Sequence, residues 1–156
     1  YDFGHFFGGT AAMNDLTPPL KRFNHLTNEI DAAYHEASLK LNLSDSALMI
    51  LYTICSFGED CLLSEINKLS GISRQTINSA LRRLEADEIV FLETYDGKKK
   101  KVCLTDKGKK VAAGTALQLI RIENEIFASW TQEEQDLYLE LTQRYLEAFR
   151  EKIKGL

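Results

Sequence analysis

The sequence predicts a mainly α-helical protein with one small β-hairpin, an α+β fold, and three observations support this expectation. Apolar residues recur every three or four positions over most of the chain, which is the period of an amphipathic helix. The pair Asp96-Gly97 separates two β-rich runs, which is a strong hairpin signal. The 156 residues are 44% hydrophobic, enough for one domain with a real core.

The elements can be placed in chain order. Residues 1–12 have no helical or strand period and are expected to be an atypical or fusion-derived leader, with a native dimer-clasping arm as the alternative. A helix is expected from Thr17 onward, and a second one, capped by Ser44 or Asp45, covers 47–57 and ends at Gly58. The remaining expected elements are a short extended piece at 61–63, helices at 64–69 and 73–87, strands at 89–95 and 101–104, and helices at 106–129 and 132–154, the last opened by a Thr131/Glu134 capping box.

Charge is unevenly distributed along the chain. The formal net charge of −4 argues against a uniformly basic surface that binds nucleic acid everywhere. Between Lys68 and Lys110, however, eleven Lys or Arg face six Asp or Glu, a net charge of +5, whereas the rest carries eight basic and seventeen acidic residues, a net charge of −9. Such segregation is typical of a protein with one face that meets a polyanion.

Membrane and disulfide chemistry are not expected. The longest nearly apolar run, residues 47–57, is shorter than the ~20 residues of a membrane span, so we expect a soluble, cytoplasmic protein. Three cysteines are too few for a disulfide framework and indicate reduced thiols. Cys55 and Cys103 are predicted to pack in the core, and Cys61, near a loop, is the only thiol considered as a redox sensor.

The stretch 64–85 meets the mechanical requirements of a helix-turn-helix. Gly71 can supply the positive φ of the sharp turn, Ile72 fills the angle between the helices, and Ser73 caps the second helix. The inward stripe of that helix consists of Ile77, Ala80, Leu81 and Leu84.

The opposite face of the second helix has no acid before Glu85. Its side chains can donate hydrogen bonds to base edges or phosphates, although a merely solvated polar face is the alternative. These residues are Gln75, Thr76, Asn78, Ser79, Arg82 and Arg83.

The motifs "LSGISRQTINSALRRLE" and "DGKKKKVCLTDKG", in this order, resemble the MarR family of bacterial transcriptional regulators over roughly residues 20–154. The resemblance implies a winged helix-turn-helix homodimer whose first and last helices intertwine, with the second motif helix in the major groove and the hairpin wing in the adjacent minor groove. The DNA-binding residues that it implies are Ser73, Arg74, Gln75, Thr76, Asn78, Ser79, Arg82 and Arg83 in the recognition helix and Asp96, Lys98, Lys99, Lys100 and Lys101 in the wing.

The chain departs from the family pattern at three positions. Lys98 replaces the arginine of the usual Asp-x-Arg in the wing, and because lysine is a flexible point charge, we expect the wing to supply affinity more than sequence choice. Glu88 stands where a glycine usually ends the recognition helix, and Asn67 where the first motif helix usually has a small alanine.

The first and last helices carry long apolar stripes, which we expect a second copy to cover, with intramolecular packing as the alternative. A two-fold dimer would set the recognition helices ~34 Å apart on an approximately palindromic operator. We therefore expect an N-terminal dimerisation helix at 13–43, the winged helix-turn-helix at 44–105 and C-terminal dimerisation helices at 106–156, all in a single domain. The predicted interface residues are Leu20, Phe23, Ile30, Leu141, Tyr145, Phe149 and Ile153.

Catalytic and metal-binding patterns are missing from the sequence. There is no Gly-rich phosphate loop, nucleophile elbow or Cys-x-x-Cys, and the surface histidines His25 and His35 are ten residues apart, so we expect no enzyme, metal or cofactor. The predicted function is that of a sequence-specific regulator that binds double-stranded DNA, and the resemblance implies release by a small-molecule ligand. A winged-helix module that binds a protein and uses its basic wing only for charge pairing is the alternative.

Overall fold

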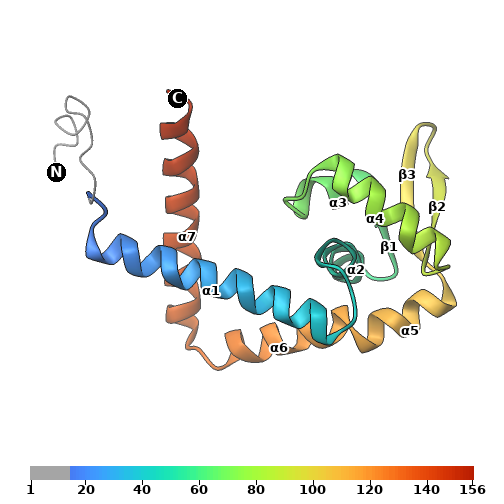
Figure 1. Ribbon diagram of the computed structural model, residues 1–156, viewed down its shortest axis with the longest axis horizontal. Coiled ribbons are helices and arrows are strands. Elements are labelled where there is room, and N and C mark those ends of the chain that lie inside the picture. Colours follow the sequence, from blue (N-terminus) through green and yellow to red (C-terminus); the bar gives the residue numbers. More distant parts are fainter. Residues whose placement is uncertain (1–14) are drawn as a thin grey trace. The chain divides into compact units, whose positions relative to one another are not determined.

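The structure of the protein is a computed structural model that describes residues 15–156. The expectations for residues 1–12 and for His5 lie outside the described residues. The chain divides into two compact units after Asn42, and each is described by itself. The elements are α1 (Pro18–Lys40), α2 (Asp45–Phe57), β1 (Asp60–Leu62), α3 (Leu63–Leu69), α4 (Arg74–Ala86), β2 (Val90–Tyr95), β3 (Lys99–Leu104), α5 (Asp106–Gly114), α6 (Ala116–Ala128) and α7 (Gln132–Ile153) (Figure 1).

The first unit contributes helix α1. Two prolines open it, at positions where the missing N–H would have no intrahelical acceptor anyway. The hydroxyl of Thr17 accepts the N–H of Leu20 at 3.4 Å and so caps the helix. The helix ends before Asn42, which has a positive φ of 55°. The helix predicted from Thr17 onward is confirmed.

The core of the second unit is built around α2, as the nearly continuous apolar run predicts. Ser44 caps this helix by accepting the N–H of Ala47 at 3.1 Å, and Gly58 ends it with a φ of 119°. Ile50, Leu51 and Ile54 are fully buried. The helix packs against α4, α6 and β1, so it anchors the helix-turn-helix to the rest of the unit.

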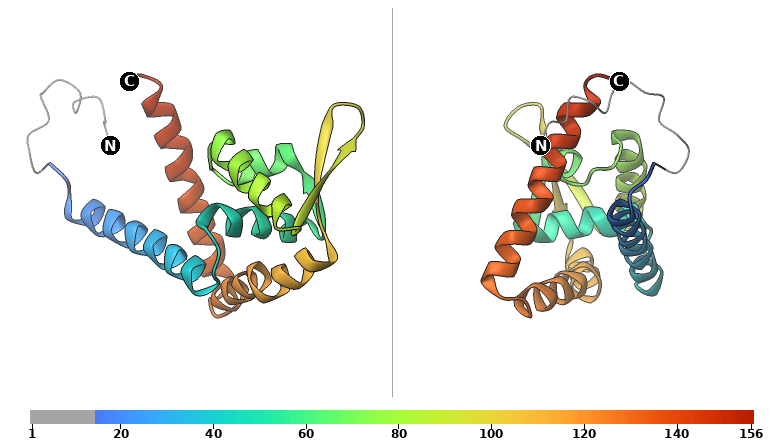
Figure 2. Two further views of the ribbon diagram at one scale, coloured as in Figure 1. Left: turned by 45° about the vertical axis from the view of Figure 1, so that its right-hand side comes forward. Right: turned by 90° about the vertical axis from the view of Figure 1, so that its left-hand side faces the viewer.

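A small sheet completes the lobe. Its strand order is β1-β3-β2 and both pairs are antiparallel, with Cys61 opposite Val102 and Leu92 opposite the same Val102 on the other side. The β2–β3 hairpin projects from the lobe as an arm (Figure 2). Strand β3 begins at Lys99, two residues earlier than predicted, because the backbone pairs already at Tyr95 and Lys99. The described chain is therefore mainly helical with a small antiparallel sheet, which confirms the predicted fold class.

The single helix predicted at 106–129 is wrong, because the chain forms α5 and α6 with a break at Thr115. Thr115 has φ and ψ of −129° and −90°, outside the helical region, and its hydroxyl donates to the Val111 carbonyl at 2.7 Å. A hydroxyl that bonds back to the preceding turn competes with the helical backbone, and the preceding Gly114 is a poor helix former.

Helix α7 begins with the predicted capping box. The N–H of Glu134 donates to the Thr131 hydroxyl at 3.1 Å, and the N–H of Thr131 donates to the Glu134 carboxylate at 3.0 Å. The turn before it is held by aromatic contacts, in which the Trp130 ring lies 5.0 Å from Phe127 and 5.3 Å from Tyr138 between ring centres. Among the helices of residues 15–156, none combines the length and the apolar character that crossing a membrane requires.

Candidate nucleic-acid interface

Helix α4 presents a polar face to solvent and an apolar face to the core. Ile77 is fully buried, and Leu81 and Leu84 are each 3% exposed, so the predicted inward stripe is confirmed at these positions. Ala80, the fourth residue of that stripe, is half-buried. Arg74, Gln75, Thr76, Asn78, Ser79, Arg82 and Arg83, all predicted to belong to the recognition helix, are exposed. The helix therefore offers only hydrogen-bond donors and neutral polar groups along its first three turns.

The turn before α4 sets the direction of this helix. Gly71 has a φ of +68°, a conformation that costs a glycine little and a residue with a β-carbon more, as the sequence predicts. Ser73 caps α4 by accepting the N–H of Thr76 at 3.2 Å, and the two hydroxyls lie 2.8 Å apart. Both hydroxyls thus hold the first turn of the helix in place, in addition to facing solvent.

The hairpin tip is a tight turn with three exposed lysines. Asp96 and Gly97 have φ values of 45° and 77°, which an Asp-Gly pair tolerates better than most other residues. Lys98, Lys99 and Lys100 are all exposed at or beside this turn.

Lys101, also predicted to be a wing residue, is held within the sheet. Its Nζ lies 3.6 Å from a carboxylate oxygen of Asp60 on β1 and 5.0 Å from the centre of the Tyr95 ring on β2. Its side chain is 28% exposed, and the residue is half-buried, whereas Lys98, Lys99 and Lys100 are exposed. The lysine run therefore divides into three outward cations and one that ties the hairpin to β1.

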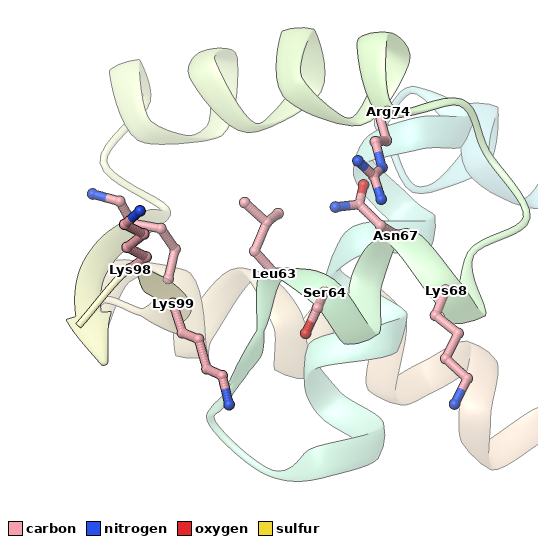
Figure 3. Close-up of a pocket in the computed structure, with 8 residues that line it drawn as sticks. Leu63, Ser64, Asn67, Lys68, Arg74, Lys98 and Lys99 are labelled. Carbon is pink, nitrogen blue, oxygen red and sulfur yellow. The ribbon is translucent and has the colours of Figure 1, made fainter. Parts of the chain in front are cut away.

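A pocket of about 410 Å³ lies where α3, the start of α4 and the wing tip come together (Figure 3). Helix α3 contributes Leu63, Ser64, Asn67 and Lys68 to its lining, and α4 contributes Arg74. The wing contributes Lys98, Lys99 and Lys100. The sequence alone did not place Ser64, Asn67 or Lys68 at the interface, because only the fold brings α3 next to the wing. The signals in the sequence were the unusual Asn67 and the position of Lys68 at the start of the basic segment.

Helices α1 and α7 carry exposed apolar side chains at helical spacing. Leu20 of α1 is half-buried, and no residue of α7 is buried within the described chain. In α7 the rings of Tyr145 and Phe149 stack with centres 6.1 Å apart. The other residues predicted to form a dimer interface are between 41% and 53% exposed, namely Phe23, Ile30, Leu141, Tyr145, Phe149 and Ile153.

The thiols and histidines have ordinary structural surroundings. Cys61 lies on β1, which directly follows the bend at residues 58–59, and its side chain is buried. Burial together with the carboxylates of Asp60 and Glu65 raises the pKa of its thiol to about 12. A thiol that stays protonated is a poor redox sensor. His25 lies 3.3 Å from Glu29 in a helical pair, and residues 15–156 contain no cluster of three or more His, Cys, Asp or Glu arranged to hold a metal.

Comparisons with known proteins agree on one family. Residues 41–100 match the sequence model described as MarR family. A MarR family regulator from Neisseria meningitidis has a TM-score of 0.76 at 17% identity, covering 89% of this chain and 99% of that chain. A MarR family transcriptional regulator from Silicibacter pomeroyi has a TM-score of 0.61 at 23% identity, covering 80% and 85%.

A third similar structure is described by its ligand. The regulator BpsR of Bordetella bronchiseptica, whose DNA binding is regulated by 6-hydroxynicotinic acid, has a TM-score of 0.59 at 18% identity, covering 80% of this chain and 98% of that chain. The comparison with curated protein sequences gave no match. Residues 41–100, which include the helix-turn-helix and most of the wing, are thus similar in sequence to the MarR family, and the chain shares the fold of MarR family regulators of known structure.

Proposed function

We propose that the protein is a transcriptional regulator that binds double-stranded DNA sequence-specifically as a homodimer. The observation that carries this proposal is the exposed face of α4, which is free of acids from Arg74 to Arg83 and is fixed in place by the buried Ile77 and Leu81. A rigid helix with outward Arg, Gln and Asn side chains has the chemistry to read base edges in the major groove.

The two basic elements have different tasks in this proposal. Gln75, Asn78 and Arg82 on α4 have planar or forked side chains that can form paired hydrogen bonds with a base edge. Lys98 and Lys99 at the wing tip are flexible point charges, which attract phosphates without distinguishing sequences. Helix α4 therefore supplies specificity, and the wing supplies affinity that depends on salt.

The homodimer is supported by the apolar stripes of α1 and α7. Side chains such as Ile30, Leu141 and Phe149 remain about half exposed in the described chain, and a self-complementary two-fold interface would remove them from water. Two copies of α4 would then lie ~34 Å apart and contact an approximately palindromic operator.

A small-molecule effector is part of the same proposal. It is supported by relatives of the same fold, since BpsR is regulated by 6-hydroxynicotinic acid and the regulator NadR was solved in complex with 4-hydroxyphenylacetate. A ligand that binds the DNA-free state more tightly than the DNA-bound state would release the operator.

Binding to genomic DNA fragments across a salt series tests the proposal. The expected result is retention of a small set of fragments that share a palindrome, with a linear fall of log affinity against log salt whose slope is about −0.9 per neutralised phosphate. Retention of no fragment at low salt would contradict DNA binding and leave the protein-binding module as the better account. Uniform retention of all fragments would contradict sequence specificity.

A further inference from the structure

The pocket between α3, α4 and the wing gathers cations that have no counter-ion. Within residues 15–156, none of Lys68, Arg74, Lys98, Lys99 and Lys100 forms an ion pair or a hydrogen bond through its side chain. No acidic residue lines the pocket. Five positive side chains from three elements therefore line one hollow, and an anion there would relieve their mutual repulsion.

Two other lysines of the same unit form ion pairs with carboxylates. Lys101 lies 3.6 Å from Asp60, and Lys109 lies 3.0 Å from Glu59. The lack of an acid is thus a property of this pocket and not of basic residues in the lobe generally.

Asn67 adds a directional group to the pocket. Its Oδ1 is buried and has no hydrogen-bond partner among the described residues. Figure 3 shows Asn67 and Arg74 pointing toward one another across the pocket. A guanidinium has five N–H donors in a planar fork, so one of them can satisfy Oδ1 while the others, and the amide N–H of Asn67, remain available to an acceptor.

We propose that this pocket binds a single phosphate group, with Arg74 and the wing lysines as the charged ligands and Asn67 as the positioning residue for Arg74. The inference rests on the proposed DNA binding, in which a backbone phosphate is the occupant. Free inorganic phosphate has the same chemistry and is the other source. Arg74 is accordingly a phosphate contact, and base readout falls to the residues from Gln75 onward.

The DNA arm of the test uses the full-length protein and the selected operator. Arg74→Ala lowers affinity for operator and unrelated DNA by the same factor, about 10-fold near 0.1 M salt, and reduces the log-log salt slope by about 0.9 per bound subunit. Asn67→Asp has the same effect, because a carboxylate beside Arg74 pairs with the guanidinium and repels phosphate. Lys110→Ala is the matched control, an exposed cation outside the pocket, and leaves affinity within 2-fold.

A second DNA experiment changes the DNA and compares the wild-type protein with Arg74→Ala. Operators carrying one neutral methylphosphonate in place of a phosphate are scanned along the backbone. One position in each half-site weakens binding of the wild-type protein about 10-fold and has no effect on Arg74→Ala, because the variant has already lost the contact. This comparison identifies the phosphate that lies in the pocket, because a variant that had failed to fold would lose binding to every operator and not the effect of one phosphate alone.

The phosphate arm needs no DNA. Inorganic phosphate is titrated into the ¹⁵N-labelled protein at constant ionic strength, and the Asn67 side-chain amide and the Arg74 Nε–H signals are followed. Saturable shifts of both signals in the wild-type protein, with no saturable shift of the Arg74 Nε–H signal in Asn67→Asp, show that free phosphate enters the pocket and competes with DNA. Shifts that do not saturate, together with the salt-slope loss of Arg74→Ala, assign the site to the DNA backbone alone.

Two results would overturn the inference. An unchanged salt slope in Arg74→Ala with an altered base preference would make Arg74 a base reader. If the wild-type protein bound no DNA, the proposed function would fail. The phosphate titration alone would then test whether the pocket binds a phosphate group, and the absence of a saturable shift would contradict it.

Discussion

The backbone of Gly108 lies directly against the carbonyl of Ile89, so that a β-carbon at position 108 would overlap the carbonyl oxygen. Thr105 ties the same two segments together, since its hydroxyl donates to the Glu88 carbonyl at 2.6 Å and its oxygen accepts the N–H of Gly108 at 2.8 Å. The motif "LTDKG" therefore has a mechanical role, which is to fix the start of α5 against the chain between α4 and β2.

Replacing Gly108 with alanine should lower the free energy of unfolding by about 3 kcal/mol, because the added methyl group meets backbone that cannot move aside cheaply. Urea unfolding followed by circular dichroism measures the change. Gly114→Ala is the matched control, as a β-carbon there would meet nothing within 4 Å, and it should leave stability unchanged or raise it by about 0.5 kcal/mol. Equal effects of the two substitutions would contradict the close approach.

Glu88 ends α4 in a conformation that suits glycine. Its φ is +57°, and the N–H groups of Glu88 and Ile89 donate to the carbonyls of Glu85 and Leu84 at 3.0 and 2.9 Å, the pattern of a Schellman cap. Glu88→Gly should therefore raise the free energy of unfolding by about 1 kcal/mol. Glu85→Gly, inside the same helix, should lower it by about 1 kcal/mol. A loss of stability in both variants would show that the left-handed residue carries no strain.

Sequence reasoning succeeded where structure depends on neighbours in the chain. The inward stripe of α4, the turn at Gly71 and the capping box at Thr131 follow from periodicity and local hydrogen bonding, and all three are confirmed. The break at Thr115 was missed because an apolar helical period runs across it, and only the backbone angles reveal that the hydroxyl bends the chain.

The site was less predictable than the fold, because several of its contacts join residues that are distant in the sequence. The exposure of the recognition-helix side chains follows from the helical period alone. The pairing of Lys101 with Asp60 depends on strand β1 lying beside β3, and these strands are far apart in the sequence. No local pattern of the sequence therefore predicts this pair. Asn67 likewise acquires a role only once α3 meets the wing.

The proposed division between specificity and affinity can be tested on the two elements separately. Gln75→Ala or Arg82→Ala should change which operator bases are preferred, by about 1 to 3 kcal/mol for each lost bidentate contact. Lys98→Ala with Lys99→Ala should weaken all sequences together and reduce the salt slope by about 0.9 per lost phosphate contact. Selection from a randomised operator library, repeated at two salt concentrations, measures both quantities. A lysine variant that altered base preference at an unchanged slope would reverse the assignment.

Cys61 should make the fold sensitive to alkaline pH. Its folded-state pKa is raised to about 12, whereas an unfolded cysteine ionises near ~8.5, so the unfolded state alone loses the proton between these values. Its contribution to stability is fully present below pH ~8.5 and is lost as pH rises toward 12. Comparison of urea unfolding at pH 7 and pH 10 should show a loss in the free energy of unfolding that is about 2 kcal/mol larger in the wild-type protein than in Cys61→Ala. The same pH dependence in both proteins would assign the effect to other groups.

The proposed dimer requires the apolar stripe of α7 to be buried, and one charged substitution can test this. Phe149 is 53% exposed and stacks on Tyr145. Phe149→Glu would place a charge in the middle of a dry interface, and loss of an aromatic hot spot of about 2 to 4 kcal/mol corresponds to a ~30- to 1,000-fold weaker dimer. Gln143→Glu adds the same charge about 200° away around the helix from Leu141, by the period of the α-helix, and should leave the mass unchanged in sedimentation equilibrium. A Phe149→Glu variant that still dimerises would contradict a dimer interface on this face of α7. A wild-type protein that sediments as a monomer would contradict the palindromic operator as well, because the spacing between two recognition helices requires a second copy.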